Sequence, residues 1–167
     1  MAFLLLHAGL ASTGPSADVS QTDVTPPFGA PLLGCLTPST GTHDPLFAQA
    51  LVLSDGTERA AIVCLDLVGM DFGTADEIRT RIERRCGIAT TLLACSHTHS
   101  APFTIPWSVQ GWEWLTGEGW PWRERLIETV TDAVARAAGN MRPVAFRRGG
   151  ALRRTSDSIV GCQRRKG

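Results

Sequence analysis

Two histidines separated by a single residue, His97 and His99, are the side chains best suited to chemistry in this sequence. They follow a short apolar run, residues 91–96, that has the composition of a β-strand. Side chains at i and i+2 of an extended chain project to the same side, so we expect both imidazoles to converge on one cation without backbone distortion. Zinc binds neutral imidazole and lowers the pKa of a bound water to about 7, so that the water can attack an amide or ester carbonyl. The pair therefore predicts a zinc hydrolase site.

The His-Thr-His spacing alone is also typical of histidines that pack in a core or lie on the surface. Its position favours a ligand role, because binding groups in α/β proteins collect at the carboxyl ends of strands. Asp66 ends another apolar strand, and we expect it either to orient one imidazole or to accept backbone hydrogen bonds. The HxHxDH arrangement of metallo-β-lactamase-like proteins is excluded, because residues 100–102 read Ser-Ala-Pro.

Strands and helices alternate along the part of the chain that surrounds these residues. Apolar runs predict the strands, and apolar residues at helical spacing predict the helices. Thr74 to Glu77 has capping-box spacing, Gly87 is a helix stop, and the sequence at 54–56, Ser-Asp-Gly, is a hairpin turn. The expected strands cover 47–53, 59–67, 91–96 and 142–148, and the expected helices cover 74–86 and 122–140. This order predicts an α/β fold, a layered mixed sheet with helices packed on it, and the apolar run at 59–67 suggests burial on both faces.

Composition narrows the class of protein. The chain has 167 residues, 43% hydrophobic and 19% charged, which is ordinary for one globular domain. Sixteen basic residues balance sixteen acidic ones, and the arginine-rich end lacks any nucleic-acid motif, so a nucleic-acid partner is not expected. No apolar run approaches the roughly 20 residues of a transmembrane helix. Five widely spaced cysteines favour a cytoplasmic over a secreted protein, with Cys64 and Cys95 as small buried hydrophobes.

Two further groups have both a structural and a functional interpretation. His43 and Asp44 could lie beside a pocket, or Asp44 could simply shape the turn before Pro45. The five tryptophans fall between Trp107 and Trp122, where they could form a lid over an acyl chain or pin a long loop; the structural role is favoured.

Four segments together resemble the N-terminal domain of the neutral/alkaline non-lysosomal ceramidase family. They are residues 23–34 (Asp-Val-Thr-Pro-Pro-Phe-Gly-Ala-Pro-Leu-Leu-Gly), residues 43–46 (His-Asp-Pro-Leu), Asp66, and residues 96–102 (Ser-His-Thr-His-Ser-Ala-Pro). The resemblance implies a zinc amidase that cleaves the N-acyl bond of a lipid-like, sphingolipid-type substrate. It implies that His97 is a zinc ligand and that His99 is either a second ligand or a catalytic stabiliser of the oxyanion. It also implies that Asp66, Ser100 and His43 lie around the metal or the pocket.

The sequence departs from that family in ways that predict an incomplete site. The family's remaining ligands, a histidine, a glutamate and a tyrosine, lie far downstream, whereas this chain has no tyrosine and no histidine after His99. Gln49 also stands where an arginine is often found. We therefore expect a flexible or weakly signal-like lead-in over 1–16 and a partial ceramidase-like domain over 17–167. The zinc hydrolase fragment and a non-catalytic remnant or binding half that needs a complementary C-terminal chain both remain open.

Overall fold

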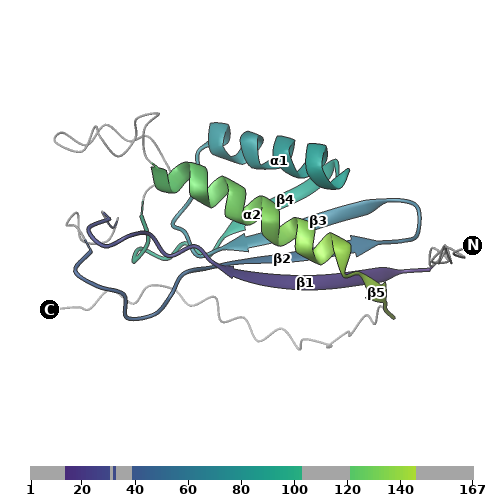
Figure 1. Ribbon diagram of the computed structural model, residues 1–167, viewed down its shortest axis with the longest axis horizontal. Coiled ribbons are helices and arrows are strands. Elements are labelled where there is room, and N and C mark those ends of the chain that lie inside the picture. Colours follow the sequence, from purple (N-terminus) through teal and green to yellow (C-terminus); the bar gives the residue numbers. More distant parts are fainter. Residues whose placement is uncertain (1–13, 31, 33–38, 103–120, 146–167) are drawn as a thin grey trace, which may run out of the picture.

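A single mixed β-sheet, with two helices on one of its faces, forms the frame of the chain (Figure 1). The computed structural model describes residues 14–30, 32, 39–102 and 121–145. The strands lie in the order β4-β3-β2-β1-β5, and the predicted α/β sheet is confirmed. In chain order the elements are β1 (Ser16–Asp23), β2 (Phe47–Ser54), β3 (Arg59–Leu65), α1 (Phe72–Cys86), β4 (Thr90–Cys95), α2 (Pro121–Gly139) and β5 (Arg142–Pro143).

The β2–β3 hairpin closes where the turn residues predict. The Asp55 carboxylate accepts hydrogen bonds from the backbone and hydroxyl of Thr57 and from the backbone N–H of Glu58, which lower its pKa to about 2. Gly56 has a φ of 102°, a backbone conformation that residues other than glycine rarely adopt. The strands on either side therefore pair in a fixed antiparallel register, with Ser54 opposite Arg59.

Helix α1 connects two parallel strands, β3 and β4, and so places the segment after each strand at the same edge of the sheet. Its N-cap is Asp71, whose carboxylate accepts from the backbone N–H of Thr74 at 2.8 Å. The prediction of Thr74 as the cap was therefore wrong by three residues; its hydroxyl instead donates to Asp71. Gly87 ends the helix in the left-handed conformation, as predicted, and its N–H donates to the carbonyl of Glu83.

Removal of the helix cap should destabilise the domain measurably. In Asp71→Ala the first-turn N–H of Thr74 loses its acceptor, and we expect a loss of about 1–2 kcal/mol in the free energy of unfolding. Urea denaturation followed by circular dichroism measures it. Asp71→Asn, which keeps an acceptor oxygen, should lose much less, and equal losses in the two variants would contradict a capping role.

Both helices pack on the same face of the sheet, and the core lies between the helices and that face. Alternate residues of the central strands, Ala48, Ala50 and Val52 in β2 and Val63 and Leu65 in β3, point into this core and are buried. The buried side chains of the helices meet them; these are Ile78, Ile82, Trp122, Leu126, Ile127, Val130, Ala133, Val134 and Ala137.

Ion pairs join the two helices at the rim of this core. Arg81 of α1 contacts Glu124 and Glu128 of α2, and Arg85 contacts Glu128 and Asp132. The carboxylates of Glu124 and Glu77 raise the pKa of the Arg81 guanidinium above its ordinary value. Because these side chains are partly solvent-accessible, solvent weakens the pairs and we expect each to add little stability.

The structure corrects three expectations about burial in the sheet. Burial of residues 59–67 on both faces was predicted, but Cys64 is exposed and Ile62 is half-exposed, because no layer covers this face in the described part of the chain. The strand predicted at 91–96 was expected to be buried, yet β4 is an edge strand whose residues alternate in exposure, with Leu92 58% exposed. Cys95 is half-buried, and burial raises the pKa of its thiol.

Two smaller points complete the fold. The strand predicted over 142–148 is represented by Arg142 and Pro143, which pair with β1, and residues 146–148 lie outside the described part. Neither of the described helices has the combination of length and apolar character needed to cross a membrane.

Candidate functional site

The chain that follows β4 remains bonded to the chain that follows β3, and this pairing positions the histidines. The N–H of Ser96 donates to the carbonyl of Leu65, and the N–H of His97 donates to the carbonyl of Leu67, both at 2.9 Å. At His97 the backbone turns into the left-handed region, with a φ of 64°. His97 is the only non-glycine residue with positive φ among those the structure describes.

The expectation of an extended, undistorted His-Thr-His segment was therefore wrong. β4 ends at Cys95, before the first histidine, so strand alternation does not set the direction of the two rings. A left-handed residue other than glycine or asparagine costs of order 1–3 kcal/mol and persists where surrounding contacts impose it. The bonds of the His97 backbone and side chain are such contacts, and strain of this kind gathers at functional sites.

A main-chain carbonyl fixes the orientation and the tautomer of His97. Its Nδ1 lies 2.7 Å from the carbonyl oxygen of Val68. A carbonyl can only accept, so Nδ1 carries the proton of this hydrogen bond and, in the neutral ring, Nε2 keeps a free lone pair. Metal-binding histidines characteristically donate their second ring nitrogen to a carbonyl or carboxylate in this way.

The second imidazole lies against the first. The ring centroids of His97 and His99 are 5.0 Å apart with an interplanar angle of 84°, and both residues are exposed. Two imidazoles on one tetrahedral zinc ion, each with its nitrogen at about 2.0–2.1 Å, have centroids about 5 Å apart. The separation of the rings and the free Nε2 of His97 therefore fit two ligands of one zinc ion.

Asp66 is bonded to the backbone at the start of β2. Its carboxylate accepts from the N–H of Phe47 at 3.0 Å, and its own N–H donates to the carbonyl of Phe47. Of the two roles expected for Asp66, the structure displays the backbone acceptor. The group that contacts the ring of His97 is the carbonyl of Val68.

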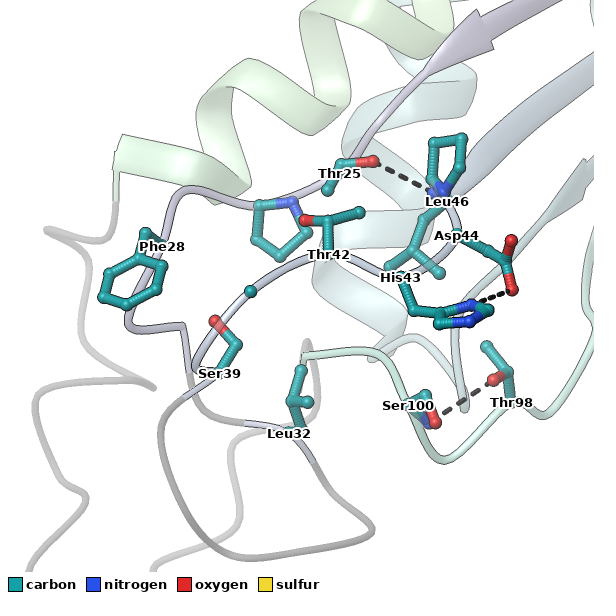
Figure 2. A pocket seen from close by; sticks show the side chains of 13 residues that line it. Thr25, Phe28, Leu32, Ser39, Thr42, His43, Asp44, Leu46, Thr98 and Ser100 are labelled. Carbon is teal, nitrogen blue, oxygen red and sulfur yellow. Dashed lines mark hydrogen bonds and ion pairs between the residues drawn. The ribbon is translucent and has the colours of Figure 1, made fainter.

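Thr98 and Ser100 of the His-Thr-His-Ser segment line part of a cavity of about 630 Å³ (Figure 2). It brings together His43, Asp44, Thr98 and Ser100, which come from two loops far apart in the sequence. The His43 Nδ1 lies 2.8 Å from the Asp44 carboxylate, and both side chains are almost fully exposed (97% and 86%). The structure therefore places His43 and Ser100 around a common cavity, next to the residues that carry the imidazole pair.

The described residues do not form a complete metal site. A catalytic zinc ion normally has three protein ligands. The described ranges contain no cluster of three or more histidine, cysteine, aspartate or glutamate side chains that could hold a metal. His97 and His99 supply two imidazoles, so a complete centre requires at least one further ligand.

Sequence reasoning missed one contributor, a main-chain carbonyl. The carbonyl of Val68 orients His97, and a main-chain carbonyl leaves no trace in residue identity. Trp122 is buried (3% exposed) and its Nε1 donates to the carbonyl of Val24 at 3.1 Å, which ties the start of α2 to the loop after β1. This contact agrees with the structural role favoured for the tryptophans; the other four lie outside the described residues.

Two solved structures with a similar fold are ceramidases. A neutral ceramidase from Pseudomonas aeruginosa matches with a TM-score of 0.63 and 19% sequence identity over 79% of this chain. A ceramidase complexed with C2 matches with the same TM-score and 18% identity. The chain spans 22% of the length of each of these structures. No protein-family profile and no curated protein matches the sequence. The chain therefore has a ceramidase-like fold. Sequence identities of 18–19% establish a similarity of fold only.

Proposed function

We propose that this chain carries part of the active site of a zinc-dependent hydrolase that cleaves an N-acyl bond of a lipid-like substrate. The observation that supports it most strongly is the imidazole pair, with His97 held by Val68 and its ring centroid 5.0 Å from that of His99. The ceramidase-like fold supports the same class of reaction. Zinc, when bound, would supply an activated water for attack on the acyl carbonyl.

The residues of this chain would have different roles in such a site. His97 would bind the metal through Nε2, because Nδ1 is engaged by the carbonyl of Val68. His99, whose exposed ring makes a T-shaped contact with His97, would bind the same ion or donate a hydrogen bond to the developing oxyanion. The cavity lined by His43, Thr98 and Ser100 would hold a polar part of the substrate, since hydroxyl groups line much of it.

A second candidate function is a non-catalytic binding half that needs a complementary chain. It is favoured by a specific observation, the presence of only two metal-binding side chains together in the described part of the chain. In that case the imidazole pair would bind zinc, and a complementary chain would have to supply the rest of the active site.

One experiment separates the two candidates. The purified chain is incubated with a fluorescent N-acyl sphingosine, with zinc or with a chelator, and release of the free fatty acid is followed by chromatography. Zinc-dependent release that disappears in His99→Ala supports the hydrolase. Zinc binding without release supports the binding half, and the absence of both zinc binding and release would contradict the proposed metal site.

A further inference from the structure

The hydrogen-bond ladder between β2 and β3 ends at Asp66 in an irregular way. In a regular antiparallel pair, two opposite residues exchange both of their N–H···O=C hydrogen bonds. Asp66 makes one of these bonds, since its N–H donates to the carbonyl of Phe47 at 2.9 Å. The N–H of Phe47, however, donates at 3.0 Å to a side-chain oxygen of Asp66. The carboxylate therefore takes the place of a main-chain carbonyl in the last pair of the ladder.

This exchange of acceptors lets the main chain turn away from β2 after Asp66. The N–H of Leu67 donates to the carbonyl of Leu65 at 2.9 Å, which closes a three-residue turn of the kind common at strand ends. Beyond that turn, the carbonyls of Leu67 and Val68 reach the chain that follows β4. There they accept from the backbone N–H and from Nδ1 of His97.

We propose that Asp66 is a positioning residue for His97 and that it acts through the main chain of residues 66–68. Asp66 ties one side of this short segment to the start of β2 with two hydrogen bonds, and the other side holds His97 with two. Leu67 is fully buried and Val68 is 6% exposed, so packing restricts the segment further. The left-handed conformation of His97, which persists only where surrounding contacts impose it, is then maintained from the neighbouring strands.

The inference rests on the proposed function, because the orientation of His97 affects catalysis only if that ring binds zinc. Partners that orient metal-binding histidines contribute about 10–100-fold to metal affinity. Asp66 is one step further from the ring than the carbonyl of Val68, so its removal should weaken zinc binding by about tenfold, the lower end of that range. The orientation itself can be measured without zinc, which separates failure of this inference from failure of the proposed function.

Nitrogen-15 NMR of the metal-free protein at about pH 8, where imidazole is neutral, reports the tautomer of His97. In the wild type we expect the proton on Nδ1, toward Val68. In Asp66→Ala the N–H of Phe47 loses its acceptor and the segment 66–68 is released, so the proton should be distributed over both ring nitrogens. Asp66→Asn, which keeps an acceptor oxygen, should retain the wild-type tautomer.

Asp55→Ala is the matched control. The Asp55 carboxylate also accepts backbone N–H groups, in the turn that joins the same two strands at the opposite end of the hairpin. Its removal should leave the tautomer of His97 unchanged. A wild-type tautomer in Asp66→Ala, or the same change in Asp55→Ala, would overturn the inference. A tautomer that depends on Asp66 in a protein that binds no zinc would support the positioning role and contradict only the proposed function.

Native-state hydrogen exchange on the wild type tests the inference if Asp66→Ala does not fold. Release of the bonds between Asp66 and Phe47 should also release His97. The amide proton of His97 should therefore open with no larger free energy than the amide proton of Phe47. A His97 amide that stays protected while the Phe47 amide exchanges would overturn the inference.

Discussion

His97→Ala should weaken zinc binding by on the order of a hundredfold or more. Loss of a group that merely orients a metal ligand costs 10–100-fold in affinity, and loss of the ligand itself removes a direct bond to the metal. In the described part of the chain, His97 is the histidine whose Nδ1 bonds to a carbonyl and whose Nε2 is free to bind zinc. No neighbouring side chain there replaces it as a zinc ligand. Isothermal titration calorimetry with zinc measures the change.

His43→Ala is the matched control for that experiment. His43 is also an exposed histidine in the same region, but its Nδ1 contacts Asp44 and its ring is not paired with another imidazole in the described structure. We expect its removal to leave the zinc affinity essentially unchanged. Equal losses from His97→Ala and His43→Ala would show that zinc binds elsewhere or without specificity.

Trp122→Ala should remove a large part of the stability of the domain. The indole is buried between α2 and the loop after β1, and truncation of a buried tryptophan costs about 3–5 kcal/mol. Because small domains have only about 5–15 kcal/mol in total, the variant should be close to unfolding at 37 °C. Urea denaturation followed by far-ultraviolet circular dichroism measures the loss.

Trp122→Phe separates the contribution of the ring's packing to stability from that of its hydrogen bond. It keeps most of the apolar volume and loses the Nε1–H that donates to Val24, so we expect a smaller loss of about 1–3 kcal/mol. If Trp122→Ala and the wild type had the same free energy of unfolding within experimental error, the indole would have no structural role. The interpretation of the tryptophans as a lid would then be favoured.

The sequence predicted most elements of the fold because those elements have a local cause, but the strands expected from apolar runs did not include β1. The Asp55-Gly56 turn, the Gly87 stop and the apolar spacing of α2 are all readable from residue type. Asp71 was missed as a cap because Thr74 and Glu77 offer the same pattern one turn later. Burial was predicted less well, since an apolar run such as β3 does not reveal whether a layer covers its second face.

The metal-binding role of the two histidines stays a prediction, whereas the geometry expected for them can be compared with the structure. The spacing of His97 and His99 indicated two imidazoles on one ion, and the rings do lie together. Strand alternation was nevertheless the wrong reason, because His97 is left-handed and is held by tertiary hydrogen bonds to Leu67 and Val68. Contacts with backbone atoms of another strand depend on the fold and have no local pattern in the sequence.

Nitrogen-15 NMR of the imidazole rings, recorded with and without one equivalent of zinc, tests the shared-ion site most directly. The chain has four histidines, so each ring can be assigned by substitution. We predict that Nε2 of His97 and one nitrogen of His99 shift together on zinc addition, while Nδ1 of His97 keeps its proton toward Val68. Shifts confined to His7 or His43, with the His97 and His99 rings unchanged, would contradict the account.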